Sequence, residues 1–479
     1  MRIQVILRYL GFVLLFNAFF LLISAGISII SADNAFYPIV FSAIVCLLFG
    51  IFPFIFVPST FDITNKEGLS IVIVGWLLSC LIGAIPYVLW GGVFSFTNAW
   101  FESVSGFTTT GSSILSNVEA LPHGLLFWRA TTHWIGGIGI IVFVLAMMPL
   151  KGSAAMILYR SEVSPLAHGN FHSRTRQTLK VLLSVYLGLT VLEILALVIQ
   201  GMSLFDAVAH SLATVATGGF STKNLSIGHF SNLGIEITII IFMVLPGIHF
   251  GLLYLFITGN PRNLYQSTII RYYIAAMLVG VLFVTISVHG SNYSLWSDAL
   301  RYSAFQVISI GTSTGFANAD TTIWPPFAQL IIIFFTLQCA CAGSTSGGIK
   351  ADRIVLLWKS FLRRIIKLRH PRAIVVVKVN QMTVNDEIVE TGLIYILIYL
   401  IVLLISSLLI TSFGIDIMTS FSGVAAAMGN VGPGFGSIGS LNNYSHLQDF
   451  VKWVLTIDML VGRLEIYGLI LFASIRWWE

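Results

Sequence analysis

The sequence predicts an all-α polytopic membrane protein, in which a pair of transmembrane helices precedes four pseudo-symmetric helix–loop–helix repeats. Of the 479 residues, 57% are hydrophobic and only 9% are charged, which gives a mean hydropathy of +0.92. Soluble globular proteins are far more polar. Apolar runs of about 20 residues recur from end to end, and each is long enough to cross the ~30 Å hydrocarbon core as a helix. A short segment rich in Ser, Thr and Gly occurs four times and sets the number of repeats.

The first two apolar runs, about residues 7–31 and 36–58, lack the features that follow. We predict an appended helix pair over residues 1–62. Arg2 and Arg8 begin the first run, but no small-residue cleavage pattern closes it. It is therefore expected to be a retained helix and not a removed signal peptide.

After residue 67 one pattern recurs: a long apolar helix, a short small-residue segment and a second long apolar helix. The short segments read FTTTGS, VATGGF, TSTGF and GNVGPG, and in each a glycine follows a β-branched residue. These glycines are roughly 100 residues apart, and this spacing is about the length of chain that two spanning helices and a re-entrant half-helix require. The predicted repeats are residues 63–165, 166–262, 263–380 and 381–479.

Short helices are expected to lead to the glycine segments. The residue pairs 98–99, 206–207 and 298–299, Asn or Asp followed by Ala, open helices of three or four turns. Such helices are too short to span, and re-entrant backbone survives at membrane depth only where protein or a water-filled cavity surrounds it. In the fourth repeat residues 419–420, Thr and Ser, replace the pair, which makes this repeat the most diverged.

The basic residues predict the topology. With the N-terminus cytoplasmic, the loops at Lys66, 151–180, 262–271 and 350–378 all lie inside, and the four glycine segments open outward. The stretch 350–378 carries nine Lys and Arg residues and one acid. This stretch has two interpretations. It either sets the topology and contacts anionic lipid headgroups, or it is a docking face for a cytosolic partner. A net charge of +5 is no evidence for a nucleic-acid partner.

Four glycine segments around one axis suit an ion filter. We therefore predict a fold of four helix–pore-loop–helix repeats around one central pore. Backbone carbonyls can replace the water shell of K⁺, and glycine allows the backbone angles that direct carbonyls at one axis. Close helix packing is the alternative use of such motifs, but it does not explain four at regular spacing. The expected potassium-binding residues are Thr109, Thr110, Gly111, Ala216, Thr217, Gly218, Ser313, Thr314, Gly315, Asn430, Val431 and Gly432.

Several strings resemble the Trk/Ktr/HKT superfamily of cation transporters over nearly the whole chain: TTTG, ATGGFST, STGFA, GNVGPGFG, CAGSTSGGIK and GRLEIY. The N-terminal helix pair and the closing GRLEIY resemble the Trk branch more than Ktr. The resemblance implies that Gly111, Gly218, Gly315 and Gly432 belong to a selectivity filter. Some HKT members carry Ser at the first of these positions and favour Na⁺, so Gly111 implies potassium.

The resemblance also implies the assembly. It implies a homodimer with one pore per protomer, in the bacterial inner (plasma) membrane, above a ring of cytosolic nucleotide-binding regulatory subunits. The chain has no glycine-rich nucleotide motif after a strand, so nucleotide is expected to bind the partner. Potassium, as the transported ion, is the ligand expected here, with no organic cofactor.

A gate is expected below the filter. Glycine density between residues 334 and 350 should break the last helix of the third repeat, and of that repeat only. The resemblance implies a loop that obstructs the pore until it moves, and Ser346 stands where the family usually has glycine. The expected gate residues are Gly343, Ser344, Thr345, Ser346, Gly347, Gly348, Lys350 and Arg463.

Arg463 lies in an apolar segment, where a charge is costly and therefore a functional candidate. Glu465 is two positions away and faces another side of a helix, so it is a poor partner. The resemblance implies that this arginine points into the pore. A fixed cation at ~4 Å opposes K⁺ by ~4 kcal/mol at an effective dielectric constant of ~20.

Other polar residues keep two interpretations each. His133, His210 and His249 are either hydrogen-bonded residues at helix interfaces or proton carriers, and His249 stands where relatives commonly have Asn. The acids Glu102, Asp206 and Asp298 either attract cations at the outer mouth or cap half-helices. The four cysteines are scattered without zinc-finger spacing and are expected to be free thiols.

Gated potassium conduction is the predicted function. The alternative is a secondary transporter of potassium or sodium coupled to Na⁺ or H⁺, in which broken helices also bind ions. No metalloprotease or serine-hydrolase motif and no pair of intramembrane aspartates is present, so we do not expect an enzyme.

Overall fold

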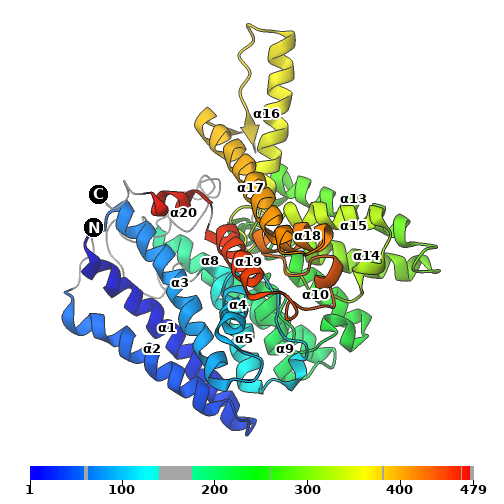
Figure 1. The fold of residues 1–479 in the computed structure, drawn as a ribbon. Coiled ribbons are helices and arrows are strands. Elements are labelled where there is room, and N and C mark those ends of the chain that lie inside the picture. Colours follow the sequence, from blue (N-terminus) through cyan, green and yellow to red (C-terminus); the bar gives the residue numbers. More distant parts are fainter. Residues whose placement is uncertain (59–62, 140–174, 260–261, 380–381, 465, 475–479) are drawn as a thin grey trace.

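The computed structural model describes residues 1–58, 63–139, 175–259, 262–379, 382–464 and 466–474. Within these ranges the chain is mostly helical (Figure 1). Six helices are long and apolar enough to cross a membrane: α1 (Ile3–Ile30), α2 (Phe36–Phe56), α3 (Asn65–Trp90), α8 (Thr175–Ile199), α13 (Thr268–Val288) and α17 (Asp386–Ser412). In α2, α8, α13 and α17 only 33% of the most apolar stretch is buried. The remaining apolar surface faces outward, as a helix in contact with lipid requires.

The two helices expected at the N-terminus are α1 and α2, which pack along each other at one edge of the molecule (Figure 1). Gly11 and Gly50 let the two backbones approach closely, because a Cβ on Gly11 would lie 2.8 Å from the carbonyl oxygen of Gly50. Small residues at a helix interface have this effect in membranes. Helix α1 also packs on α3 and α5 and thereby attaches the pair to the rest of the fold.

A short helix follows each of four long ones and packs against it, as the pairs α3·α4, α8·α9, α13·α14 and α17·α18. These short helices are α4 (Phe96–Phe107), α9 (Leu204–Val215), α14 (Trp296–Gly311) and α18 (Ile417–Gly429). These helices have 12 to 16 residues, and at 1.5 Å per residue they reach only ~18–24 Å, less than the ~30 Å of the hydrocarbon core. The expected half-helices are therefore present.

The half-helices begin about one turn before the residue pairs that were expected to open them. Ser95 and Ser203 are the N-cap residues of α4 and α9, and their hydroxyls accept hydrogen bonds from the amides three residues later. In α18 the cap is Asp416, which accepts from the amide of Thr419. The fourth half-helix therefore does begin at an acid, and the Thr-Ser pair taken as its opening lies inside it. Alignment of the four repeats with one another did not reveal this acidic cap, because the acid is shifted by one helical turn relative to the acids of the other repeats.

A second set of helices follows the glycine segments: α5 (His123–Ile138), α10 (Leu233–Val244), α15 (Pro326–Leu337) and α19 (Asp449–Leu464). Further elements are α11 (Phe250–Ile257), α12 (Arg262–Gln266), α16 (Ala351–Arg369), α20 (Ile466–Ala473), the strands β1 (Lys378–Val379) and β2 (Met382–Thr383), and the 3₁₀ turns η1 (Val118–Ala120), η3 (Ser226–Phe230), η4 (Thr321–Ile323) and η5 (Gly436–Ile438).

Among the described residues, helix breaks with a described turn or loop between the two helices are found in the second and third repeats. The expected break separates α15 from α16, but α10 and α11 are also separated, by a turn containing Pro246 and Gly247. The expectation that only the third repeat has a broken helix is therefore wrong. Proline lacks the amide hydrogen that a continuous helix needs, and the two breaks contact each other: the amide of Cys341 donates to the carbonyl of Gly247 at 3.1 Å.

The basic stretch at 350–378 forms α16 and the strand after it, and it projects from the helical body beside the start of α17 (Figure 1). Leu356, Val377 and Val389 form a small apolar cluster that holds this projection together. Arg364, Arg369 and Arg372 are exposed. Most of the basic loop expected at 151–180 lies outside the described residues.

Candidate functional site

Four loops follow the half-helices, and they share one backbone conformation. The first loop residue has a left-handed φ of 51° to 58° in every case: Thr109, Thr217, Ser313 and Asn430. The third residue is a glycine with φ between 80° and 100°: Gly111, Gly219, Gly315 and Gly432. The amide of the residue between them donates to the carbonyl five residues earlier, at 2.8–2.9 Å: Thr110, Gly218, Thr314 and Val431. The predicted filter segments thus adopt equivalent geometry.

The second loop corrects the predicted alignment by one residue. Gly218 was aligned with Gly111, Gly315 and Gly432, but Gly219 has the matching positive φ, and Gly218 occupies the position of Thr110. Two consecutive glycines stand at this place in the sequence. The motif of a β-branched residue followed by glycine selects Gly218, which directly follows Thr217. Only the backbone angles and the amide hydrogen bond identify Gly219 as the equivalent position. Ala216 is the C-cap residue of α9, directly before this loop.

Each of the four glycines packs against the backbone of another loop. A Cβ on Gly111 would lie 2.2 Å from the carbonyl oxygen of Gly218, and one on Gly219 would lie 2.0 Å from that of Thr314. The same contact joins Gly315 to Val431, at 1.8 Å, and Gly432 to Thr110, at 2.6 Å. The contacts run from the first loop to the second, third and fourth, and then back to the first. Glycine avoids both the clash with this backbone and the strain of the positive φ, so a larger residue here would require the neighbouring loop to shift.

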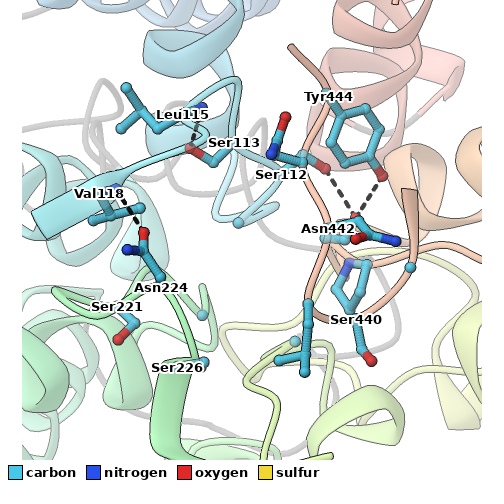
Figure 2. A pocket seen from close by; sticks show the side chains of 18 of the residues that line it. Ser112, Ser113, Leu115, Val118, Ser221, Asn224, Ser226, Ser440, Asn442 and Tyr444 are labelled. Carbon is cyan, nitrogen blue, oxygen red and sulfur yellow. Dashed lines mark hydrogen bonds between the residues drawn. The ribbon is translucent and has the colours of Figure 1, made fainter. Parts of the chain in front are cut away.

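The four glycines face a cavity of about 120 Å³, shown in Figure 2. Hydroxyl and amide side chains line it, among them Ser113, Asn224, Ser440 and Asn442. The uncharged oxygens of this lining suit a weakly held monovalent cation. Arg129 and Lys223 also line the cavity, and they pair with Glu102 and Asp206.

Of the three acids expected near this mouth, Glu102 and Asp206 have structural partners, and Asp298 lies in the first turn of α14. Glu102 is fully buried, forms an ion pair with Arg129 at 2.5 Å, and accepts a hydrogen bond from the amide of Ile114. Its predicted role as a helix cap is wrong, since it lies inside α4. Asp206 accepts from the hydroxyls of Ser203 and Thr222 and does belong to the start of its helix.

Arg129 was not singled out from the sequence, although it lies in α5 and lines the cavity. Its guanidinium lies 3.5 Å above the ring of Phe220, beside the second loop, and donates to the carbonyl of Ser221 at 2.9 Å. An arginine within an apolar helix is the signal that could have identified it. Its charge is balanced by Glu102, so the mouth carries no net charge from this pair.

At the opposite end of the four loops lies the segment between α15 and α16. The hydroxyl of Thr217 donates to that of Thr345 at 3.1 Å. A Cβ on Gly347 would lie 2.2 Å from Oδ1 of Asn430. This segment, residues 339–350, contains most of the residues that the sequence predicted to form a gate, and it is called the gate loop below for that prediction. It contacts the first residues of two loops, whereas the cavity contacts the third residues.

Arg463 holds the gate loop from α19. Its guanidinium donates to the carbonyl of Thr345 at 2.5 Å and to the carbonyls of Gly136 and Gly137 at 2.6 and 2.9 Å. Those glycines end α5, where a helix presents unpaired carbonyls and a partial negative charge. Glu465 lies outside the described residues.

Within the gate loop, Ser346 adds a bond that glycine could not make, because its hydroxyl accepts from the amide of Ala340 at 3.2 Å. Gly343 and Gly348 have φ values of 78° and 66°. Ser344 donates to the carbonyl of Cys341 at 2.6 Å. Lys350 is the N-cap residue of α16 and is partly exposed.

The family model described as TrkH, cation transport protein, matches residues 41–477. The chain belongs to the TrkH family of cation transport proteins. The Trk system potassium uptake protein TrkH of Escherichia coli K12 is 35% identical over 422 residues, which are 87% of each chain. That of Halomonas elongata is 32% identical and covers 100% of both chains. The crystal structure of the potassium transporter TrkH from Vibrio parahaemolyticus matches with a TM-score of 0.90 at 30% identity, over 100% of both chains.

Membership of the TrkH family confirms the predicted resemblance to the Trk branch. Together with the six apolar helices, it makes the chain a multi-pass membrane protein of a cation transporter family. The relatives are named as potassium uptake proteins of Trk systems, so potassium is the ion to test first at the four loops.

The histidines in this TrkH-family chain have structural contacts. His210 is hydrogen-bonded through both ring nitrogens, to the carbonyl of Asp206 at 2.7 Å and the hydroxyl of Ser221 at 2.9 Å. His133 stacks on Phe220 with 4.0 Å between ring centroids. His249 caps α11, since its Nδ1 accepts from the amide of Gly251 at 3.0 Å. A side chain that accepts at this position is what Asn would also supply.

The cysteines are buried and free, as expected. Among the described residues no group of three or more His, Cys, Asp or Glu side chains is arranged to hold a metal ion.

Proposed function

We propose that this chain conducts potassium across the plasma membrane through a selectivity filter formed by its four loops. The observation that carries the proposal is the closed cycle of contacts from Gly111 through Gly219 and Gly315 to Gly432. Four equivalent loops in a cycle enclose one axis. Their carbonyls can then form stacked rings of oxygen that replace the hydration shell of K⁺.

The four filter strands contribute unequal side chains to this proposed pseudo-fourfold site. Hydroxyl pairs brace the first and third strands, with Oγ1 of Thr108 and Thr110 2.8 Å apart and Oγ1 of Thr312 and Thr314 also 2.8 Å apart. In the fourth strand Asn430 donates to the hydroxyl of Thr110 at 3.0 Å. We infer that neighbouring strands are held at fixed spacing, which disfavours contraction around the smaller Na⁺ ion.

In this proposal the gate loop keeps the pore closed. It lies at the inner end of the loops, and Arg463 fastens it to the end of α5. Opening requires that Thr345 leave the guanidinium, and removal of a fixed cation from the ion path would lower the barrier to K⁺.

In this proposal a cytosolic nucleotide-binding subunit controls the gate, and it docks on the projecting basic helix α16. A homodimer in the bacterial inner membrane, with a cytoplasmic N-terminus, completes the proposal. The purified chain by itself should bind ATP, ADP and NAD no better than a denatured control does.

One observation favours the alternative of a transporter coupled to H⁺. Asp458 is 2% exposed in α19, and among the described residues its carboxyl accepts a hydrogen bond from the hydroxyl of Ser406 at 2.8 Å and forms no ion pair. A buried carboxyl without a counter-charge is costly in its ionised form and readily takes a proton. A strict dependence of potassium uptake on a proton gradient, abolished in Asp458→Asn, would establish this alternative.

Ion flux into vesicles tests the main proposal. Wild-type protein should pass K⁺ and Rb⁺ well above Na⁺, and Gly111→Ser should reduce that preference, because the added side chain meets the carbonyl of Gly218. Gly188→Ser is a matched control, since nothing lies within 4 Å of a Cβ at that position. Equal K⁺ and Na⁺ flux in the wild type would contradict the proposal.

A further inference from the structure

Two hydroxyl groups converge on one backbone carbonyl at the cavity. The carbonyl oxygen of Gly432 accepts a hydrogen bond from the hydroxyl of Tyr444 at 2.7 Å and another from that of Ser112 at 3.0 Å. Both side chains are 2% exposed or less as residues, and Figure 2 shows them directed at the same atom. A carbonyl oxygen has two lone pairs, so both acceptor positions of Gly432 are occupied by protein.

The other three glycines differ in this respect. Among the described residues, no hydrogen bond to the carbonyl oxygen of Gly111, Gly219 or Gly315 is found. The four loops share their φ angles and packing, so this difference arises from the side chains and not from the backbone.

Tyr444 is held in place from three directions. Its amide donates to the carbonyl of Ser113 at 2.8 Å, its ring lies 5.4 Å from that of Phe101, and its hydroxyl reaches Gly432. Ser112 belongs to the first loop and Gly432 to the fourth. The bond from Ser112 therefore joins the first and last loops of the cycle, and the amide of Tyr444 makes a second link to the first loop through Ser113.

We propose that Tyr444 and Ser112 form a clamp that fixes the carbonyl of Gly432, and that this clamp is a determinant of ion selectivity. The inference rests on the potassium filter proposed above. With its lone pairs occupied, the Gly432 oxygen is a weaker and immobile ligand, so the outermost oxygen ring has three free carbonyls and one held carbonyl. The number and field strength of coordinating oxygens set the preference between K⁺ and Na⁺.

Release of the clamp has a definite consequence. A freed Gly432 carbonyl can turn toward the axis and add a fourth oxygen, so that the ring contracts around a smaller cation. Tyr444 and Ser112 are thus positioning residues, which act on the ion through the oxygen of Gly432.

The test is Tyr444→Phe, which removes the donor and keeps the ring. The K⁺, Rb⁺ and Na⁺ fluxes of purified protein are compared in vesicles. The ratio of K⁺ to Na⁺ flux should fall about two- to tenfold, the range that the net contribution of one hydrogen bond covers. Ser112→Ala should lower the ratio in the same direction, and the double variant should lower it further.

Tyr87→Phe is the matched control. Tyr87 is also fully buried, and its hydroxyl has no hydrogen-bond partner among the described residues, so the same chemical change there should leave the ratio unchanged. An unchanged ratio in both Tyr444→Phe and Ser112→Ala would overturn the clamp, as would a lower total flux at constant ratio. If the wild-type protein did not prefer K⁺ over Na⁺, that result would instead contradict the proposed filter, and the clamp that depends on it.

Discussion

Replacement of Arg463 by alanine should open the pore without any partner subunit. The side chain makes one hydrogen bond to the gate loop, at Thr345, and two to the end of α5, at Gly136 and Gly137. A hydrogen bond from a charged donor contributes about 1.5–3 kcal/mol net. Of these three bonds, the one to Thr345 holds the loop directly, and 1.4 kcal/mol is a tenfold change in an equilibrium constant. The fraction of open gate loops should therefore rise roughly 10- to 100-fold.

The assay is Rb⁺ uptake into vesicles that contain purified protein and no cytosolic subunit. Arg463→Ala should raise basal uptake. Arg463→Lys is the control: it keeps the positive charge, but a single ammonium cannot bond to carbonyls on both sides as a planar guanidinium does, so its uptake should lie between wild type and alanine. Unchanged or lower uptake in Arg463→Ala, at wild-type thermal stability, would refute the assignment of Arg463 to the gate.

Three further predictions concern folding. Glu102→Gln leaves Arg129 buried without its counter-charge and should lower the free energy of unfolding by about 3–5 kcal/mol; thermal unfolding in detergent at the wild-type temperature would contradict this. Hydrogen bonds from Thr419 lower the pKa of Asp416. The stabilisation by this cap is therefore present at neutral pH and lost as the pH falls through the lowered pKa, and Asp416→Asn should remove that part of the acid sensitivity seen in unfolding curves. His249→Asn should retain stability and ion flux, whereas His249→Ala should cost about 1 kcal/mol by loss of the cap on α11; equal stability of the two variants would show that the cap contributes nothing.

Local patterns predicted the half-helices and the four loops well. Each half-helix combines an apolar sequence with a length below that of a span, and each loop ends in glycine because L side chains avoid the positive φ found there. The gate loop was predictable for the same reason, since glycine and proline act on the backbone at their own positions.

Partnerships between distant residues were not predictable in this way. Glu102 and Arg129 look like separate intramembrane charges in the sequence, and their pairing depends on how α4 packs against α5. The break between α10 and α11 was overlooked because one Pro-Gly step is a weaker local signal than the glycine-rich run near residue 345.

The amino-acid sequence by itself determined that this protein lies in a membrane, that it contains four related loops and that a glycine-rich break interrupts one helix. Those properties follow from hydrophobicity and backbone preferences, which act residue by residue. Only the tertiary structure decided that Gly219 and not Gly218 completes the set of glycines, that Arg463 reaches Thr345, and that Tyr444 and Ser112 meet at Gly432. The contacts of Arg463 with Thr345 and of Ser112 with Gly432 join residues more than 100 positions apart, and their geometry arises only when the four loops close into a cycle.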